Sequence, residues 1–375
     1  MKKLNLTLVA GARPNFMKIA SLIHAIKAKQ AIENSVSYRL VHTGQHYDSK
    51  LSEVFFEDLQ IPMPDANLEV GSGTHAEQTA EIMIRFERYI RANPTDWVIV
   101  VGDVNSTLAC SLVAKKLGIK VAHVEGGIRS GDRSMPEEIN RLATDAIADM
   151  FYTTSVFANE HLKREGKLEE QIQLVGNTMI DSLIRNQSRL SQPGLFEKHQ
   201  LEKGNYYLMT LHRPSNVDDL DVFQKLLQSI LKSTGKSKLV FPVHPRTNKR
   251  LQEMGFKWPG QVILAEPLRY LEFLYLVKHA KAVITDSGGI QEETTYLQIP
   301  CLTLRANTER PETIFVGTNI LIGNNMQLLA DSLVKIENND WKKGTIPEFW
   351  DGETGNRIIN DLLFKRESHK IVALH

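Results

Sequence analysis

The sequence is poor in cysteine, has no excess of charge of either sign and lacks a long apolar run, and each of these shortages excludes a class of protein. Its two cysteines, Cys110 and Cys301, are too few for a disulfide framework or a cysteine metal site and suit a reducing compartment. Lysine and arginine number 45 against 44 acidic residues, so the net charge of +1 gives no general attraction to nucleic acid. No apolar run approaches the length of a membrane span. We therefore expect a cytoplasmic protein that binds neither nucleic acid nor membrane.

Two familiar nucleotide motifs are also missing. No GxGxxG follows the first apolar segment, which argues against a dinucleotide-dependent dehydrogenase. The GKS sequence at 235–237 resembles the end of a P-loop, but Ile230 occupies the position of its first glycine. Asp219 and Asp221 stand at a predicted helix start, where capping is favoured over metal binding. These motifs therefore give no evidence for a nicotinamide, a P-loop nucleotide or a metal.

What the sequence does contain is a long alternation of apolar strands and amphipathic helices, which is typical of parallel sheets covered on both faces. A chain of 375 residues is too long for one core and fits two such domains. The first segment is expected to be a strand and not a signal peptide, because Asn5 interrupts its apolar run. The predicted strands are Leu4–Ala10, Val36–Val41, Trp97–Val101, Lys120–Val124, Met150–Thr153, Tyr206–Thr210, Lys238–Val243, Val262–Ala265, Ala282–Thr285 and Cys301–Leu304. The predicted helices of the first half are Phe16–Lys29, Ser49–Asp58, Ala76–Ala92, Ser106–Leu117 and Pro136–Asp149.

The alternation weakens once, and this interruption predicts the domain boundary. We place the first domain at residues 1–176, a linker at 177–204 and the second domain at 205–354. The closing segment, 355–375, is helical in pattern and is expected to complete the first domain. In doubly wound folds the ligand lies outside the carboxyl ends of the strands, so we expect a site in a cleft between the two domains.

The stretch 285–313 carries the strongest signal for a ligand. A short apolar strand is followed by Asp-Ser-Gly-Gly and a helical pattern, so Gly288 and Gly289 are predicted to form a tight turn before a helix. Glycine lets backbone N–H groups approach a ligand closely, and the helix N-terminus favours an anion. Glu293 follows in the first turn, where a carboxylate can accept hydrogen bonds from ribose, and Arg310 lies in the loop beyond. The alternative is an ordinary helix N-cap, because a Gly-Gly turn alone is weak evidence.

Polar side chains also accumulate where other predicted strands end. Arg13 and Lys18 follow the first strand, Asp103 and Glu125 follow two strands of the first half, and His212 follows the first strand of the second half. Each residue alone is more often structural than functional. Together they predict a site with carboxylates on the first domain and cations around them.

Glu137 supports two interpretations. The sequence from Ser134 to Glu137 has the pattern of a capping box, in which the glutamate only holds a helix start. Arg141 lies one turn further on and can pair with it. The preceding loop is long, polar and rich in glycine, which favours a functional role for Glu137 over capping alone.

Taken together, the motifs resemble those of the non-hydrolysing UDP-N-acetylglucosamine 2-epimerases. The segments GARPNFMKIA, TGQHYD, GDVNSTLA, HVEGGIRSGDRSMPEEINR, LHRPSN, PVHPRT and DSGGIQEE…TERPE occur in the same order, from about Leu4 to Gly323. The resemblance implies a GT-B-like α/β fold of two Rossmann-like, doubly wound domains, a homodimer, and no metal or other cofactor. It also implies interconversion of UDP-GlcNAc and UDP-ManNAc, through elimination of UDP to a 2-acetamidoglucal and its re-addition.

The resemblance also implies roles for individual residues. The catalytic set it implies is Asp103, Glu125, Glu137 and His212. The substrate-binding set is Arg13, Lys18, Ser287, Gly288, Gly289, Glu293 and Arg310. A possible allosteric site for UDP-GlcNAc is implied at Gln45, Arg213 and His244. Departures include Asn15 in place of an acid, HRPSN in place of HRREN, and Leu268 where a glutamine is common. Asp48 and the segment HAEQT also look different from the family, so an allosteric response is left open.

Three other functions stay open. The nearest is a 2-epimerase for another N-acetylated UDP-sugar, such as a 2,3-diacetamido uronic acid. A GT-B glycosyltransferase would share the nucleotide site but needs fewer acids on the first domain, and a UDP-sugar sensor would bind without turnover. The sequence does not identify the sugar, the pathway or the carboxylate that serves each face of C2.

Overall fold

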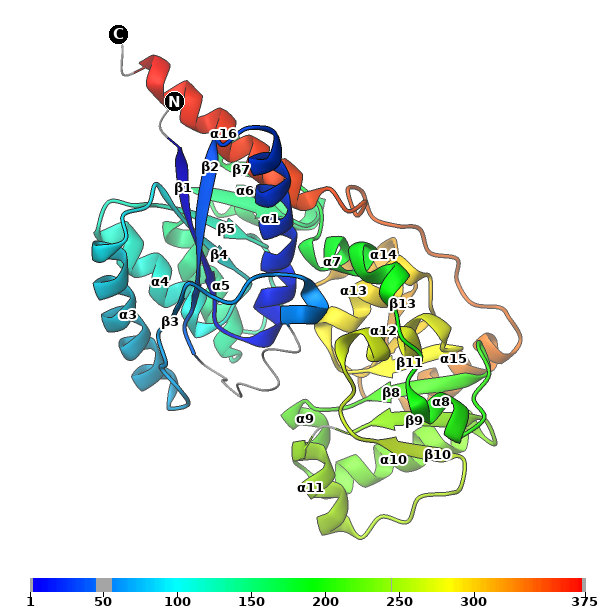
Figure 1. Ribbon diagram of the computed structural model, residues 1–375. Helices are drawn as coiled ribbons and strands as arrows, with labels where there is room; N and C mark the ends of the chain where they lie inside the picture. The colour runs from blue at the N-terminus through cyan, green and yellow to red at the C-terminus, as the bar shows by residue number, and fades with distance from the viewer. Residues whose placement is uncertain (1–2, 45–55, 244, 373–375) are drawn as a thin grey trace. The chain divides into compact units, whose positions relative to one another are not determined.

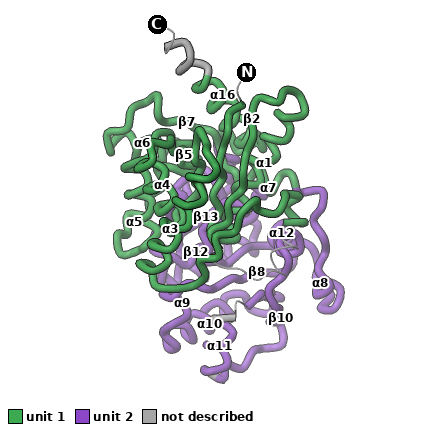
Figure 2. Tube along the Cα trace, turned by 60° about the vertical axis from the view of Figure 1, so that its left-hand side comes forward, with its two compact units in different colours: residues 1–185, 348–375 green, residues 186–347 purple. Residues whose placement is uncertain are grey.

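The computed structural model describes residues 3–44, 56–243 and 245–372, and the chain divides into two compact units. Unit 1 comprises Met1–Arg185 and Glu348–His375, and unit 2 comprises Asn186–Pro347 (Figure 2). The segment 177–204, predicted as a linker, contains the boundary between the two units and two α-helices. Helix α7 (Thr178–Asn186) falls almost wholly in unit 1, and α8 (Gly194–Lys198) falls in unit 2.

Unit 1 is built on one parallel sheet (Figure 1). The strands pair in the order β3-β2-β1-β4-β5-β6-β7. They are β1 (Leu4–Ala10), β2 (Val36–His42), β3 (Ala66–Asn67), β4 (Trp97–Val101), β5 (Lys120–Val124), β6 (Met150–Thr153) and β7 (Ile172–Leu174). The central strand β4 is buried at every residue, as expected for a parallel strand covered on both faces.

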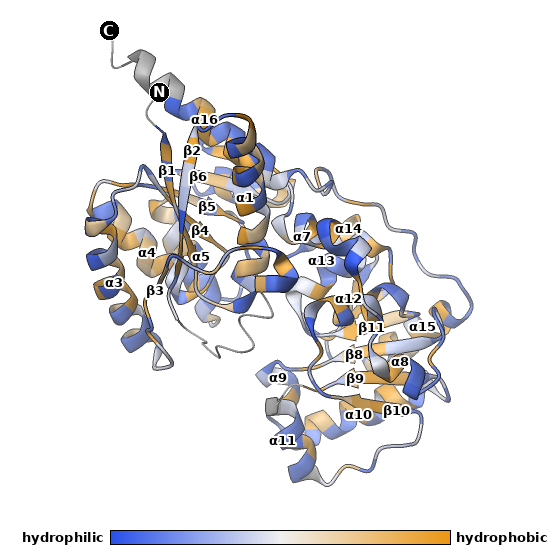
Figure 3. Cartoon of the chain, in the orientation of Figure 1, coloured by the Kyte–Doolittle hydropathy of each residue, from blue (hydrophilic) through white to orange (hydrophobic). Residues whose placement is uncertain are grey.

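Helices pack their apolar sides on this sheet. One core joins Val98 and Val100 of β4 to Phe86 and Ile90 of α3 and to Val113 of α4, and Figure 3 shows the hydrophilic residues of α3 and α4 alternating with the hydrophobic ones. The helices are α1 (Arg13–Ile32), α3 (His75–Ala92), α4 (Asn105–Lys116), α5 (Pro136–Ile147), α6 (Val156–Arg164), α7 and α16 (Thr354–Val372), with a 3-10 turn at Glu169–Gln171.

The closing helix α16 packs against α1 within unit 1, although the two are far apart in the sequence (Figure 1). Asp181 of α7 connects them. Its Oδ2 accepts hydrogen bonds from the Ser21 hydroxyl, at 2.5 Å, and from the Gly355 backbone N–H, at 2.9 Å. Tyr152 also donates to Asp361 at 2.8 Å.

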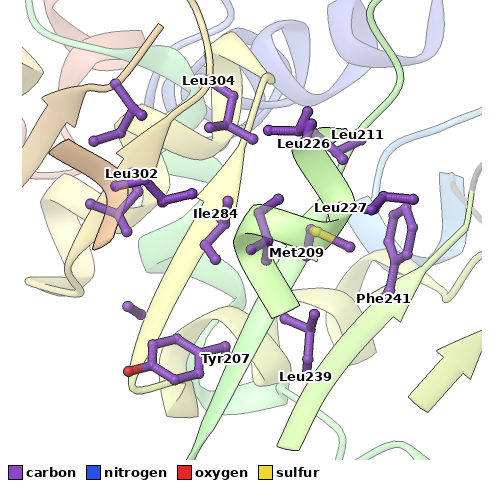
Figure 4. Close-up of a cluster of buried hydrophobic side chains, with 14 of the residues drawn as sticks. Tyr207, Met209, Leu211, Leu226, Leu227, Leu239, Phe241, Ile284, Leu302 and Leu304 are labelled. Atoms are coloured by element: carbon purple, nitrogen blue, oxygen red, sulfur yellow. The ribbon is translucent and has the colours of Figure 1, made fainter. Parts of the chain in front are cut away.

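Unit 2 repeats the architecture with a second parallel sheet in the order β10-β9-β8-β11-β12-β13. Its strands are β8 (Tyr206–Thr210), β9 (Lys238–Pro242), β10 (Val262–Ala265), β11 (Ala282–Thr285), β12 (Cys301–Thr303) and β13 (Asn319–Leu321). Figure 4 shows Met209 of β8, Phe241 of β9, Ile284 of β11 and Leu302 of β12 in one buried cluster, to which a helix contributes Leu227.

Helices and one 3-10 turn complete unit 2. They are the turn Gln187–Arg189, α8, α9 (Pro214–Val217), α10 (Leu220–Thr234), α11 (Pro245–Met254), α12 (Tyr270–His279), α13 (Gly288–Leu297), α14 (Pro311–Phe315) and α15 (Met326–Glu337). Asp219 is the N-cap of α10 and accepts from the backbone N–H groups of Asp221 and Val222, so the capping role predicted for this acidic pair is confirmed for Asp219.

Each sheet reverses its winding once. In unit 1 the chain runs outward from β1 to β3 and then returns to place β4 on the other side of β1; in unit 2 it does the same between β8 and β11. At such a switch point the loops that follow the two central strands diverge, leaving a crevice where ligands bind. The residues after β1 and β4, and those after β8 and β11, are therefore the places to look for a site.

The α/β class and the doubly wound sheets are confirmed, whereas several element bounds differ from the prediction. Helix α1 begins at Arg13 and not at Phe16, because Pro14 fits the first turn of a helix. The short edge strands β3, β7 and β13 were missed. The predicted helix Ser49–Asp58 falls mostly outside the described residues. Within the described ranges, every helix is too short or too polar to cross a lipid bilayer.

Candidate active site

One amide side chain ties the start of α1 to the ends of β1 and β4. Asn15 Oδ1 accepts hydrogen bonds from the backbone N–H groups of Gly11, at 3.2 Å, and Ala12, at 2.9 Å. Its Nδ2 donates to the Val101 carbonyl at 3.2 Å. An amide can accept and donate at once, whereas an ionised carboxylate only accepts. This explains how asparagine serves at a position where the resembled family carries an acid. Arg13 is exposed in the first turn of the same helix.

A buried ion pair lies at the switch point of unit 1. Lys18 Nζ is 2.7 Å from Glu125 Oε2, and the two side chains are 11% and 2% exposed. Glu125 has a φ of 70°, a left-handed conformation that costs a residue with a Cβ roughly 1–2 kcal/mol. A Cβ added to Gly102 would lie 3.2 Å from Lys18 Nζ, so the turn after β4 lies against this pair. Such strain persists where the surroundings enforce it, and it gathers at functional sites.

Asp103 is held by α5 through an arginine. Asp103 Oδ2 lies 2.5 Å from Arg141 Nη2, and Arg141 Nη1 lies 2.9 Å from Glu138 Oε2. Glu138 also accepts from the backbone N–H groups of Ser130 and Gly131, at 2.9 and 3.1 Å. Burial acts to raise the pKa of Glu138, but these donors and Arg141 outweigh it, so its pKa lies below the ordinary value. Glu138 is thus a fixed anion that orients Arg141 toward Asp103.

Glu137 shares a cavity of about 310 Å³ with Asp103. The N-cap of α5 is Met135, with no side-chain cap, and the Ser134 hydroxyl donates to Asp132 Oδ1 at 2.6 Å. The capping box considered for Ser134 and Glu137 is therefore not formed at this helix start, and Glu137 lines the cavity instead. Other residues lining this cavity are Ala12, Gly73, His75, Gln78, Asn105 and Asn140.

In unit 2 a buried carboxylate orients His212. Asp286 directly follows β11, is fully buried, and lies with its Oδ1 2.8 Å from His212 Nδ1. Its Oδ2 accepts from the Arg213 backbone N–H at 2.9 Å and from Asn216 Nδ2 at 3.0 Å. The His212 side chain is 47% exposed. With Nδ1 directed at the carboxylate, Nε2 is the ring nitrogen left for a ligand.

The charge of Asp286 is stabilised by its neighbours. Burial acts to raise the pKa of Asp286, but His212, the Arg213 N–H and the Asn216 amide outweigh it and hold the pKa below its ordinary value. The sequence interpretation treated Asp286 only as part of a turn and missed this partner of His212. The signal that could have found it is the position of both residues after the two strands that flank the switch point.

The predicted phosphate turn begins the helix itself. Ser287 is the N-cap of α13, and Gly288 and Gly289 form its first turn, so the glycines are not in a loop before the helix. A Cβ added to Gly288 would lie 3.2 Å from Glu309 Oε1. Glu309 Oε2 in turn lies 2.7 Å from Arg305 Nη2, and both side chains are buried. The helix N-terminus is therefore bordered by an ion pair, and a Cβ at position 288 would make a tight contact with it.

Arg310 and Glu293 lie deeper than the sequence suggested. Arg310 Nε is 2.7 Å from Glu292 Oε1, and these side chains are 9% and 1% exposed. Glu293, predicted to bind ribose, is 4% exposed. Burial, with a smaller contribution from the charge of Glu292, raises the pKa of Glu293 to about 8. Glu293 is thus a protonated carboxyl group at neutral pH in the folded chain.

This pKa predicts a change of stability with pH. The folded chain keeps a proton on Glu293 between its ordinary pKa of 4.5 and about 8, while the unfolded chain loses it. The stabilising contribution is therefore complete below about pH 4.5 and is lost as pH rises to about 8, at a slope of at most about 1.4 kcal/mol per pH unit.

Glu293→Gln, which mimics the protonated group, should gain stability relative to wild type between about pH 6 and about pH 9 in urea unfolding. Glu160→Gln, an exposed control, should show no such gain. If the free energy of unfolding of Glu293→Gln differed from that of wild type by the same amount at about pH 6 and at about pH 9, the raised pKa of Glu293 would be contradicted.

An apolar recess lies at the carboxyl ends of β8 and β9 in unit 2. Its volume is about 330 Å³. His212, which is bonded to Asp286, forms part of its wall, so the recess is adjacent to the start of α13. The sequence interpretation did not predict this recess. Its lining residues are Thr210, Leu211, His212, Pro242, Val243, Pro267, Leu268 and Phe273.

Of the three residues suggested for an allosteric site, only Arg213 is among the described residues. Gln45 and His244 lie outside them. Arg213 Nε donates to the Asp286 backbone carbonyl at 3.1 Å, and its Nη2 lies 3.9 Å from Glu309 Oε1. Arg213 therefore borders the start of α13.

Comparison with known proteins gives consistent matches over nearly the whole chain. The family model described as UDP-N-acetylglucosamine 2-epimerase matches residues 28–363. The UDP-N-acetylglucosamine 2-epimerase of Methanocaldococcus jannaschii is 39% identical over 372 residues, covering 96% of this chain and 99% of the relative. The UDP-2,3-diacetamido-2,3-dideoxy-D-glucuronate 2-epimerase of Pseudomonas aeruginosa is 37% identical, covering 86% and 90%. A crystal structure of the M. jannaschii enzyme in complex with UDP-GlcNAc and UDP superposes with a TM-score of 0.86 at 40% identity, covering 96% of this chain and 100% of that one.

Proposed function

This chain belongs to the UDP-N-acetylglucosamine 2-epimerase family, and from that premise we propose that it interconverts UDP-GlcNAc and UDP-ManNAc. It is an isomerase of the GT-B-like fold. The observation that carries the proposal is the strained and buried Glu125, paired with Lys18 beside the turn that bears Asp103. A family relationship names the reaction, and this cluster supplies the acid–base groups that the reaction needs.

The chemistry explains why several carboxylates are required. The hydrogen on C2 of the sugar is not acidic, because no carbonyl group is attached to C2. Its removal is therefore coupled to cleavage of the C1–O bond, so that UDP leaves and a 2-acetamidoglucal forms. UDP then adds back to C1 while a proton is delivered to the opposite face of C2. One base and one acid must serve the two faces, and Asp103, Glu125 and Glu137 are the candidates in unit 1.

Unit 2 supplies groups suited to UDP. The N-terminus of α13, at Ser287, Gly288 and Gly289, presents backbone N–H groups to the diphosphate. The apolar recess beside His212 suits a planar base such as uracil, with Phe273 available for stacking. The protonated Glu293 would act toward a ribose hydroxyl as a donor as well as an acceptor. Arg13, Lys18, His212 and Arg310 are the cations proposed to stabilise the leaving diphosphate.

Substitution of Gly289 tests the phosphate site. Gly289→Val adds a branched side chain to the helix turn that is proposed to contact the diphosphate, so UDP affinity should fall by about 10-fold or more while the fold is kept. Calorimetry with UDP measures the change, and a circular dichroism spectrum identical to that of wild type confirms the fold. Gly260→Val, at a surface site with open space around its Cβ position, is the matched control. Unchanged UDP affinity in Gly289→Val would remove α13 from the proposal.

Solvent exchange tests the reaction itself. Incubation with UDP-GlcNAc in D₂O should place deuterium at C2 of both epimers, because the proton removed from one face is not the one returned to the other. Proton NMR follows the loss of the C2 signal. A glycosyltransferase or a UDP-sugar sensor would bind the same nucleotide without exchange at C2, so an unlabelled C2 after prolonged incubation would reject the proposal.

A second substrate has one observation in its favour, the similarity to the P. aeruginosa diacetamido-glucuronate 2-epimerase. The two candidates differ in charge, because the uronate carries a carboxylate on the sugar. Comparing kcat/KM for UDP-GlcNAc and for the diacetamido uronate decides between them, and the substrate with the larger value is the one used.

We also propose that the protein is a cytoplasmic homodimer. The dimer rests on the resemblance to the epimerase family. Two buried free cysteines, Cys110 and Cys301, agree with a reducing compartment. Light scattering that gave the mass of one chain at micromolar concentration would overturn the dimer.

A further inference from the structure

A fully buried histidine lies beneath the proposed acids of unit 1 and has no part in the function proposed above. His123 is in β5, two residues before Glu125, and it is 0% exposed. Its Nε2 lies 2.8 Å from the carbonyl oxygen of Gly102, the residue before Asp103. Its Nδ1 lies 2.6 Å from Asp145 Oδ1 on α5. One imidazole ring therefore connects the turn after β4 to α5.

Both ring nitrogens of His123 have fixed hydrogen-bond partners. A carbonyl oxygen only accepts, so Nε2 must donate to Gly102. Asp145 is an ionised acceptor, because its Oδ2 takes a hydrogen bond from the Gly127 N–H at 2.9 Å and lies 2.7 Å from Arg129 Nη1. Burial acts to raise the pKa of Asp145, but His123, Arg129 and Gly127 outweigh it and keep its pKa below the ordinary value. The His123 ring is therefore held between the Gly102 carbonyl and the Asp145 carboxylate.

Asp145 belongs to a larger network of paired charges. Arg129, which pairs with Asp145, also pairs with Glu165, at 2.6 Å between Nη2 and Oε2. On the other side of the Gly102 turn, Lys18 and Glu125 form their own neutral pair. A buried charge is tolerated when it is paired and hydrogen-bonded in this way.

We propose that His123, with Asp145, is a positioning residue that fixes the two turns bearing Asp103 and Glu125 for catalysis. The inference rests on the proposed function. The φ angles of Gly102, Glu125 and Gly127 are 68°, 70° and 78°, so both turns contain backbone in the left-handed region. His123 holds the Gly102 carbonyl and Asp145 holds the Gly127 N–H, which constrains the residue before Asp103 and residues on both sides of Glu125. Loss of this constraint would let Asp103 and Glu125 relax away from the reacting geometry.

The first test is a measurement on the histidine ring itself. With ¹⁵N-labelled histidine, the wild-type protein should show one ring whose Nε2–H exchanges slowly with solvent, because that N–H is fully buried and donates to the Gly102 carbonyl. That signal should disappear in His123→Gln. A His123 ring without a protected Nε2–H would overturn the proposal, whatever the activity of the variants.

The second test separates positioning from folding. His123→Gln, which keeps a donor for Gly102, and Asp145→Asn should each lower kcat by about 10²-fold while KM and UDP affinity stay within about three-fold of wild type. His123→Phe, which keeps only the volume, should be slower than His123→Gln. His199→Gln on unit 2 is the control and should behave as wild type. The stoichiometry of UDP binding gives the fraction of each variant that is folded. If kcat fell only in proportion to that fraction, the role of His123 and Asp145 would be merely structural.

Failure of the proposed function is distinguishable from failure of this inference. If wild type exchanges no deuterium at C2, the epimerase assignment and the positioning role of His123 both fall. If wild type exchanges but folded His123→Gln and Asp145→Asn keep kcat within about three-fold, only the positioning role falls.

Discussion

Replacing Glu125 by glutamine is expected to lower the rate of epimerisation by about 10²–10⁴-fold, because a positioned acid or base contributes about that much to a proton transfer. Glutamine keeps the size of the side chain and its hydrogen bond from Lys18, but it can neither take nor return a proton. The rate of deuterium incorporation at C2, followed by NMR, measures the step that should fail. UDP affinity should be nearly unchanged, since the proposed nucleotide site lies in unit 2.

The control for this substitution is Glu87→Gln. Glu87 is an exposed glutamate of α3 that pairs with Arg91 one turn away, so its loss should leave the rate unaltered. If Glu125→Gln turns over within about three-fold of wild type, Glu125 is not part of the mechanism.

The positions of the candidate acids followed from the sequence because two simple regularities sufficed. Apolar runs such as Trp97–Val101 mark buried parallel strands, and polar residues directly after them must lie at one edge of the sheet. This rule placed Asp103, Glu125 and His212 at strand ends before the strand order was known. The capping of α10 by Asp219 was predicted in the same local way.

What the sequence did not reveal depends on contacts between distant segments. Asp286 meets His212 only because β11 pairs with β8, and the residues are 74 positions apart. The strand order that brings them together is not encoded in either strand. The left-handed φ of Glu125 had no local signal either, since it is imposed by packing and not by a glycine.

Short elements and buried charges were missed for a related reason. Edge strands β3, β7 and β13 have two or three residues, which is too few to show the alternation of apolar and polar residues that indicates a strand. Arg310 is expected to meet a phosphate, and its Nε also lies beside Glu292, a partner that the sequence did not indicate. A charged residue gives the same sequence signal whether its partner is a ligand or a buried carboxylate.

Asp286→Asn is expected to lower the epimerisation rate by about 10²–10⁴-fold, although Asp286 itself need not touch the substrate. In the wild-type chain its carboxylate accepts from His212 Nδ1 and so leaves Nε2 for the ligand. An asparagine can turn its amide N–H₂ toward the ring, which then presents the wrong tautomer. The substitution also replaces an acceptor among several donors, which should reduce stability by about 1–3 kcal/mol. Single-turnover rates on the folded fraction separate the two effects, and Asp221→Asn on α10 is the control.

A double substitution decides whether Asp286 acts through His212. If it does, removing the carboxylate matters only while the imidazole is present, so Asp286→Asn in the His212→Gln background should change the rate by less than about three-fold. If the two residues had independent roles, their effects on the rate would multiply. The double variant would then be slower than His212→Gln by the full effect of Asp286→Asn. The double variant should still show the stability loss of Asp286→Asn, because the Arg213 N–H and the Asn216 amide donate to the same carboxylate whatever residue occupies position 212. A multiplied rate loss would therefore count against the orienting role while leaving the structural one intact.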